Sequence, residues 1–307
     1  MTVLVFAASD KGGTGRSVTS ANLAYHRALA GDDVCYLDFD FGSPTAAAVF
    51  DVSHARRASE DRGLHTYLGG QVSEPFRIDV WSQTEHPVLR NRPPGAGRLV
   101  LMPGDLGGGE FATTEDNLRL CVDLLLRLNN EFDLIIVDLS AGRSYAVDMA
   151  LAATSQREMR GVEARWLVFH RWTHQHVGAA ANLVFGKRGI IAGGRARGHD
   201  EDELRNAIRF VRAAVPDPES PLWSQVSSTQ SAWMRQCDTD LKRLASTQSI
   251  GYSQVLGSVP LEPVLQWREQ LITDEDVLDS QIANRETWEA LSELARRLTD
   301  DKYWEQP

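Results

Sequence analysis

Residues 2–17 read TVLVFAASDKGGTGRS and join an apolar run, a glycine-rich turn and the start of a helix. The apolar run at residues 2–7 predicts a strand, and residues 17–30 carry apolar side chains at helical spacing: Val18, Leu23, Ala24 and Leu29. In a strand–turn–helix unit the main-chain N–H groups of the turn converge, glycine permits close approach, and the helix dipole favours anions. The segment therefore predicts a phosphate site at the end of the first strand.

Strands and helices alternate through the rest of the first half. Short apolar runs at residues 33–39, 98–102 and 134–137 are accompanied by an amphipathic stretch at residues 118–128. Continuous apolar strands alternating with amphipathic helices predict a parallel sheet that is covered on both faces. We therefore expect an α/β fold, doubly wound, with a mainly parallel sheet and helices on both faces.

The second half is less regular. Its pattern predicts strands at residues 165–169 and 253–259, and helices at residues 175–185, 231–245 and 285–298. Residues 186–198 hold five glycines and four basic residues, and residues 217–221 are rich in proline, so both are expected to be loops. We expect a single domain over residues 1–307, with a divergent, loop-rich region at about 154–252.

The composition excludes several classes of protein. With 32 Lys and Arg against 42 Asp and Glu the net charge is −10, and 42% of residues are hydrophobic, as in ordinary globular proteins. No apolar run reaches the roughly 18 residues of a membrane span, and the N-terminus lacks the pattern of an export signal. Three widely spaced cysteines do not suggest a disulfide framework or a zinc ribbon. We expect a cytoplasmic protein, and the acidic balance argues against general nucleic-acid binding.

The glycine-rich turn departs from the standard phosphate loop, G-x-x-x-x-G-K-[ST]. Asp10 stands at the first glycine position and Arg16 stands at the lysine position. On that pattern alone, a tight turn without a ligand explains the glycines equally well. However, residues 11–17, KGGTGRS, closely resemble the deviant Walker A motif of the ParA/MinD family of P-loop ATPases.

Two acidic motifs extend this resemblance. Residues 36–41, YLDFDF, look like the family's D-x-D motif at the end of strand two, and residues 132–142, FDLIIVDLSAG, look like its Walker B strand. Weaker similarities lie at residues 63–70, 99–104 and 259–263. The resemblance is strong through about residue 142 and thin over residues 154–252, and it implies a P-loop NTPase fold that is ParA/MinD-like.

The resemblance also implies roles for individual residues. ATP would be bound by Gly12, Gly13, Thr14, Gly15, Arg16, Ser17, Val18 and, at the adenine, Pro260. Ser17 and, through water, Asp138 would hold Mg²⁺. Asp40 would orient the attacking water, Asp38 would support the metal shell, and Lys11 would reach the nucleotide of a partner subunit. From the residues alone, Asp38 and Asp40 could instead cap a helix or form salt bridges in the following loop.

Arg16 is the departure with the largest consequence. Arginine is wider than lysine and forked, although it still neutralises phosphate charge. Val18 also lacks the hydroxyl that many relatives carry beside the metal-binding residue. We expect ATP binding with slow hydrolysis, and a scaffold that binds nucleotide without turnover is the second interpretation.

The implied function is a nucleotide-dependent dimerising switch that positions or recruits a cargo through an adaptor. An ATP-dependent metabolic or maturation enzyme on the same fold is the alternative. Such enzymes usually carry an additional cofactor site, for example a cysteine pair, which this sequence lacks.

Three further segments have open interpretations. His170, His174 and His176 could bind a metal but are expected to form an exposed or interface loop. The basic residues Lys187, Arg188, Arg195 and Arg197 could follow a DNA backbone, although acidic residues come directly after them. The last helix places apolar residues on one face, and because residues 283–307 carry six acids and four bases, we expect packing on the sheet rather than membrane binding.

Overall fold

The computed structural model describes residues 2–54, 62–217, 219–220, 223 and 225–305. Its strands form one sheet in the order β3-β4-β2-β5-β1-β6-β7-β8, parallel except that β3 runs antiparallel to β4. The strands are β1 (Val3–Ala8), β2 (Val34–Phe39), β3 (Ile78–Asp79), β4 (Leu99–Met102), β5 (Leu134–Leu139), β6 (Glu163–Arg171), β7 (Ile208–Val215) and β8 (Val255–Pro260).

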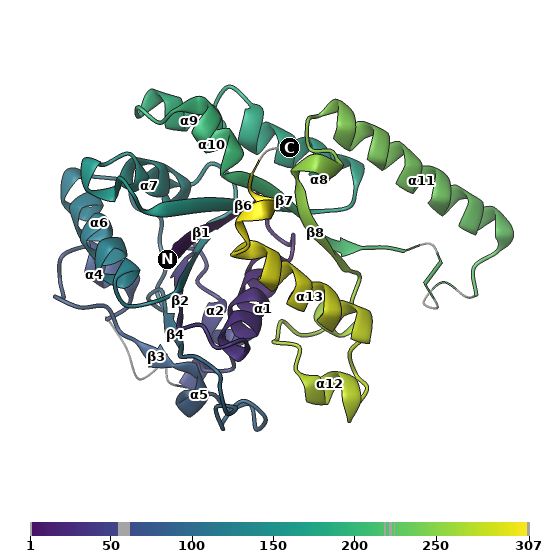
Figure 1. Ribbon diagram of the computed structural model, residues 1–307, viewed down its shortest axis with the longest axis horizontal. Coiled ribbons are helices and arrows are strands. Elements are labelled where there is room, and N and C mark those ends of the chain that lie inside the picture. The colour runs from purple at the N-terminus through teal and green to yellow at the C-terminus, as the bar shows by residue number, and fades with distance from the viewer. Residues whose placement is uncertain (1, 55–61, 218, 221–222, 224, 306–307) are drawn as a thin grey trace.

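Helices cover both faces of this sheet (Figure 1). On one side lie α4 (Leu64–Leu68), α6 (Glu115–Asn129), α7 (Tyr145–Thr154), α8 (His174–Phe185), α9 (Ile190–Ala196) and α10 (Glu201–Asn206). On the other side lie α1 (Arg16–Leu29), α2 (Ala46–Val49), α5 (Val80–Gln83), α12 (Asp274–Leu278) and α13 (Arg285–Leu298). The long helix α11 (Ser228–Thr247) extends away from the body of the molecule. The predicted doubly wound α/β fold is confirmed.

Successive side chains of β1 point to opposite faces of the sheet and enter two separate hydrophobic cores. Leu4 and Phe6 point into the core beneath α6, α7 and α8, whereas Val3 and Val5 point into the core beneath α1 and α13. All four side chains are buried, because β1 pairs in parallel with β5 on one side and β6 on the other. A strand covered on both faces is expected to be apolar throughout, as β1 is over Val3–Ala8.

The carboxyl edge of the sheet, at which its parallel strands end, gathers the acidic motifs. Asp138 pairs in register with Ala7 on β1 and with Asp38 on β2. The glycine-rich turn leaves β1 at the same edge. Three segments far apart in the sequence therefore meet where an open parallel sheet binds its ligands.

One prediction for the second half is wrong. Residues 186–198 were expected to be a loop, but they contain α9, whose Ile190 and Ile191 are buried. Gly194 lies against Leu204 of α10, where a Cβ would come within 2.4 Å of the leucine side chain. Tertiary packing, which requires glycine at this contact, outweighs the low helix propensity of glycine.

Three elements of the second half, α10, β7 and α12, were also missed. Arg209 and Arg212 interrupt the apolar run of β7, so its pattern does not predict a buried strand. The expected loop at residues 217–221 lies partly outside the described residues.

The C-terminal helix packs on the body of the molecule, as expected. Leu291, Leu294 and Leu298 are buried where α13 contacts α1 and β8. Within the described part of the chain, none of the helices combines the length and the apolar character needed to cross a membrane.

Candidate functional site

The glycine-rich turn forms a loop between β1 and the first residue of α1, Arg16. Gly13 and Gly15 have φ angles of 70° and 79°, in the left-handed region that side chains disfavour. Gly15 is also the N-cap of α1 and has no side chain to satisfy the first N–H groups of the helix. These donors remain available for an anion, so the local geometry matches the predicted phosphate site.

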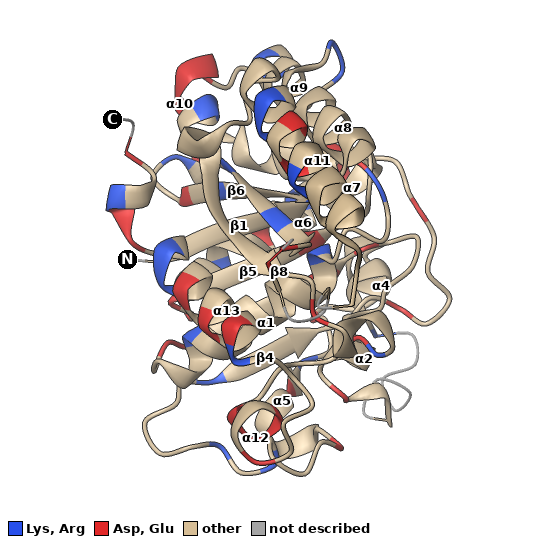
Figure 2. Cartoon of the chain, turned by 90° about the vertical axis from the view of Figure 1, so that its right-hand side faces the viewer, with Lys and Arg blue, Asp and Glu red and all other residues tan. Residues whose placement is uncertain are grey.

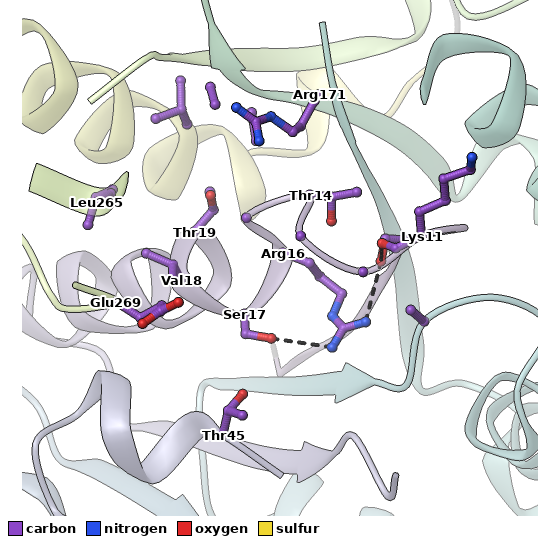
Figure 3. A pocket seen from close by; sticks show the side chains of 18 of the residues that line it. Lys11, Thr14, Arg16, Ser17, Val18, Thr19, Thr45, Arg171, Leu265 and Glu269 are labelled. Carbon is purple, nitrogen blue, oxygen red and sulfur yellow. Dashed lines mark hydrogen bonds between the residues drawn. The ribbon is translucent and has the colours of Figure 1, made fainter. Parts of the chain in front are cut away.

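A cavity of about 410 Å³ opens beside this loop (Figure 3). Its volume lies in the range of small-molecule sites. Every predicted nucleotide-binding residue lines it: Gly12, Gly13, Thr14, Gly15, Arg16, Ser17, Val18 and Pro260. Lys11 and Asp40 also line it, whereas Asp38 and Asp138 are buried and do not line it.

The guanidinium of Arg16 points into the acidic residues at the carboxyl edge. Its Nε donates to Asp138 Oδ1 at 2.5 Å, and its Nη2 donates to Asp40 Oδ2 at 2.8 Å. Weaker bonds reach Ser17 Oγ at 3.3 Å and Ser9 Oγ at 3.4 Å (Figure 3). Arg16 is 6% exposed and forms an ion pair with both carboxylates.

These contacts determine the charge states of the group. Burial by itself would lower the pKa of Arg16, but the charges of Asp138 and Asp40 and their hydrogen bonds outweigh it, so the pKa is raised. Burial raises the pKa of Asp40, and the neighbouring Arg16 only partly offsets this effect. Arg16 is therefore permanently charged, and its charge partly compensates the charges of Asp40 and Asp138.

Asp38 has a different environment. Its carboxylate accepts hydrogen bonds from the main-chain N–H groups of Asp40 at 3.3 Å and Ala46 at 3.0 Å. Ala46 is the first residue of α2, so Asp38 holds the start of this helix against β2. This contact matches the alternative offered from the sequence, in which Asp38 caps a helix. The role of Asp38 in a metal shell stays a prediction.

The residues expected to hold Mg²⁺ do not fit a metal ion in this arrangement. Ser17 Oγ and Asp138 Oδ1 are already bonded to the guanidinium of Arg16. The charge of that guanidinium also offsets one of the two carboxylate charges that would attract a divalent ion. Asp138 Oδ2 is buried and, among the described residues, has no hydrogen-bond partner. The magnesium site at Ser17 and Asp138 therefore stays a prediction, and Arg16 would have to move for it to form.

Lys11 lies at the rim of the cavity and points away from the guanidinium of Arg16 (Figure 3). It is partly exposed. The structure holds a single chain, so the predicted reach of Lys11 to a partner subunit stays a prediction.

The three histidines do not form one group. His170 is buried, whereas His174 is exposed, and His176 lies 2.8 Å from the hydroxyl of Thr173 at the start of α8. Over the residues that the structure covers, no group of three or more His, Cys, Asp or Glu side chains could hold a metal ion.

The basic residues of the 186–198 segment divide into two pairs. Arg195 forms an ion pair with Glu201 at 3.4 Å, and Arg197 forms one with Asp148. Lys187 and Arg188 are exposed. Half of the predicted DNA-binding charge is thus balanced by acids of this chain.

Sequence reasoning missed the far wall of the cavity. Arg171 at the end of β6, Ala214 of β7, and Leu265 and Glu269 after β8 all line it. Arg171 could have been found, because it lies two residues beyond the strand predicted at 165–169, at the carboxyl edge. Ala214 could not: its φ of 50° and the register shift between β7 and β8 are visible only in the paired strands.

Comparisons with known proteins agree with this geometry. Residues 5–254 match the family model described as the CobQ/CobB/MinD/ParA nucleotide binding domain. No curated protein matches the chain in sequence.

Several solved structures have the same fold. A chain of the MinC:MinD cell division protein complex of Aquifex aeolicus is 17% identical, with a TM-score of 0.62 over 97% of this chain and 95% of that one. MinD of Pyrococcus horikoshii with Mg-ADP is 16% identical, with a TM-score of 0.54 over 98% and 97%. The pNOB8 ParA protein bound to nonspecific DNA is 16% identical, with a TM-score of 0.57 over 98% and 99%.

Proposed function

The chain belongs to the CobQ/CobB/MinD/ParA nucleotide-binding family, and we propose that it is an ATP-binding switch that dimerises with bound nucleotide and positions or recruits a partner. The observation that carries this proposal is the glycine loop at the start of α1, which opens into a cavity of about 410 Å³. A loop of this kind binds a polyphosphate through its N–H groups and the helix dipole.

The cavity has linings that suit both ends of a nucleotide. The loop residues Lys11, Gly13 and Gly15 line it, as do the apolar residues Val259, Pro260 and Leu265. Apolar walls with a few polar groups are typical of sites that hold a base. We propose that ATP lies with its phosphates on the loop and its adenine near Pro260.

Dimerisation is supported by the position of Lys11. Its side chain lies at the rim and points away from Arg16, so it is free to approach phosphate from outside its own site (Figure 3). We propose that Lys11 contacts the nucleotide of the partner subunit, as the ParA/MinD resemblance implies.

The partner is proposed to be a protein. One solved relative is a MinD bound to MinC, and another is a ParA bound to nonspecific DNA. In this chain basic and acidic segments are interspersed along α11 and α13 (Figure 2), and Arg195 and Arg197 are paired with acids. The net charge of −10 further weakens attraction to DNA, so DNA binding through Lys187, Arg188, Arg195 and Arg197 is the lesser proposal. A site of action in the cytoplasm is part of this proposal.

A hydrolysis-incompetent scaffold is the second candidate, and one observation favours it. Asp40, the residue proposed to orient the attacking water, accepts a hydrogen bond from Arg16. A carboxylate held in this way is a poor water-activating group, so we expect turnover to be slow or absent.

The test is to measure ATP binding by fluorescence and molar mass by light scattering. We expect a dimer with ATP and a monomer without it. Lys11→Ala should retain ATP binding but lose the dimer, and Lys187→Ala is the matched control that should keep both. If the wild-type chain neither binds ATP nor changes mass, the proposal is wrong.

A further inference from the structure

We propose that the guanidinium of Arg16 is the resident cation of this site and takes the place of a divalent metal ion. Where ATP binds as proposed above, on which this part of the inference rests, it binds equally well without a divalent metal. Asp40 and Asp138 then serve to hold Arg16 and do not coordinate a metal.

Occupancy is the first support for this inference. The guanidinium contacts Asp138, Asp40 and Ser17 at once, through distances of 2.5, 2.8 and 3.3 Å. Ser17 and Asp138 are the two residues that were expected to hold Mg²⁺. The guanidinium thus occupies an oxygen atom of each residue and offsets one of the two carboxylate charges, and it leaves Asp138 Oδ2 as the oxygen of that carboxylate without a partner among the described residues.

The shape of arginine is the second support. Its planar fork places Nε on Asp138 of β5 and Nη2 on Asp40, which follows β2, while Nη1 lies 3.4 Å from Ser9 Oγ. Lysine has a single charged nitrogen on a flexible stem and no second donor group displaced from it. Arg16 can therefore bridge two carboxylates that a lysine would not hold together in this geometry.

Burial is the third support. Arg16 and Asp138 are 6% and 0% exposed, so salt does not screen their attraction. Removal of the guanidinium would leave two carboxylates facing each other, a costly arrangement that an added divalent cation would relieve. Arg16 thus prevents the two carboxylates from binding a metal ion, and a metal site should form only when the guanidinium is removed.

The first experiment needs no nucleotide. Mn²⁺ binding to the full chain is measured by electron paramagnetic resonance for the wild type, Arg16→Met and Arg16→Lys. We expect the wild type to bind no Mn²⁺ at this site, and the two variants to gain a site that a second change, Asp138→Asn, removes. Arg143→Met is the matched control, since it removes an arginine bonded to Asp10 at 3.0 Å beside the same loop and should gain no Mn²⁺.

Circular dichroism establishes that each variant is folded. If Arg16→Met does not fold, Mn²⁺ binding is measured on Arg16→Lys instead. This variant keeps a positive charge but lacks the fork that holds both carboxylates. Mn²⁺ bound by the wild type and lost in Asp138→Asn would overturn the inference. So would folded Arg16 variants that gain no Mn²⁺.

The second experiment measures ATP affinity in MgCl₂ and in EDTA. The wild type should bind ATP with the same Kd in both, whereas Arg16→Lys should bind at least about tenfold more weakly in EDTA than in MgCl₂. A wild type that binds ATP only with Mg²⁺ overturns the inference.

The two proposals fail in different ways. A wild type that binds ATP in neither buffer, together with Arg16 variants that gain Mn²⁺, would contradict the proposed function and leave Arg16 as the resident cation. ATP binding and dimerisation that both require Mg²⁺ would support the proposed function and overturn the role of Arg16.

Discussion

Arg16 and Arg209 are buried to nearly the same extent, 6% and 4% exposed, but they lie at opposite edges of the sheet and have different partners. Arg16 meets two carboxylates at the carboxyl edge. Arg209, near the start of β7, donates to the carbonyl oxygens of Tyr303 at 2.9 Å and Trp304 at 2.8 Å. The ring of Trp304 lies over it, with its centroid 5.4 Å from the guanidinium carbon.

The charge environment of the two residues differs in consequence. Burial and the nearby charge of Arg165 lower the pKa of Arg209, whereas the acids around Arg16 raise its pKa in spite of burial. Carbonyl oxygens and an aromatic face satisfy the donors of an arginine without cancelling its charge. Arg209 thus holds the C-terminal segment through its carbonyl oxygens, whereas Arg16 is paired with the acids of the candidate site.

The largest expected change in stability follows from removing one of the two carboxylates that pair with Arg16. Asp138→Asn should lower the free energy of unfolding by about 4 kcal/mol, because a buried guanidinium loses one of its two counter-charges. Urea denaturation followed by circular dichroism measures this change. Asp133→Asn, just before the start of the same strand, should cost less than about 1 kcal/mol. Equal losses in the two variants would contradict the special role of the Arg16 pair.

The second prediction concerns the opposite edge. Trp304→Ala should lower the free energy of unfolding by about 3 kcal/mol, since it removes a buried ring that covers Arg165 and Arg209. It should leave the ATP affinity unchanged. Trp267→Ala, at a side chain that is 92% exposed, is the control and should change stability by less than about 0.5 kcal/mol. A loss of ATP binding in Trp304→Ala would show that the two edges are coupled.

A third prediction asks whether burial alone disfavours a positive charge, as at Arg209. Burial lowers the pKa of His26, on α1 beside Trp288, to about 4 from its ordinary 6.5. Since the unfolded chain binds the proton more readily, the stability that neutral His26 contributes is complete above about pH 6.5 and is lost as the pH falls toward 4.

Between pH 7 and pH 5 this loss should be about 2 kcal/mol. Urea denaturation at the two pH values should show His26→Gln losing about 2 kcal/mol less than the wild type. His174→Gln, at an exposed histidine, should behave as the wild type does. If His26→Gln has the wild-type pH dependence, His26 is already protonated or hydrated in the folded protein.

The smallest change in stability is expected for ion pairs that are exposed to solvent. A hydrogen bond from Arg296, helped by one from Arg297, lowers the pKa of Glu293 on α13 to about 2, although burial works against this. Because these side chains are 32% to 47% exposed, water and salt screen them. Glu293→Gln should cost only about 0.5 kcal/mol, and that cost should fall further in high salt. A thermal-unfolding difference as large as that of Asp138→Asn would contradict the distinction between buried and exposed pairs.

Most of the first half could be predicted because its determinants are local. Strand β1 and helix α1 follow from apolar periodicity, and the loop between them follows from glycines that adopt left-handed φ angles. Pro260 was assigned to the nucleotide site by resemblance, and it does line the same cavity as the loop. The loop predicted over α9 was wrong, because the burial of Ile190 and the contact of Gly194 with Leu204 exist only after α7, α8 and α10 have come together.

The amino-acid sequence by itself determined the α/β class, the glycine-rich loop and the acids at the carboxyl ends of β2 and β5, because each depends on residues that are neighbours in the chain. Only the tertiary structure decided where the side chain of Arg16 points. Its partner Asp138 lies 122 positions away, and the two meet because β1 and β5 pair in register. The pattern KGGTGRS places a positive charge beside a phosphate loop, but a guanidinium is drawn to the nearest buried carboxylates, and those are set by the order of the strands.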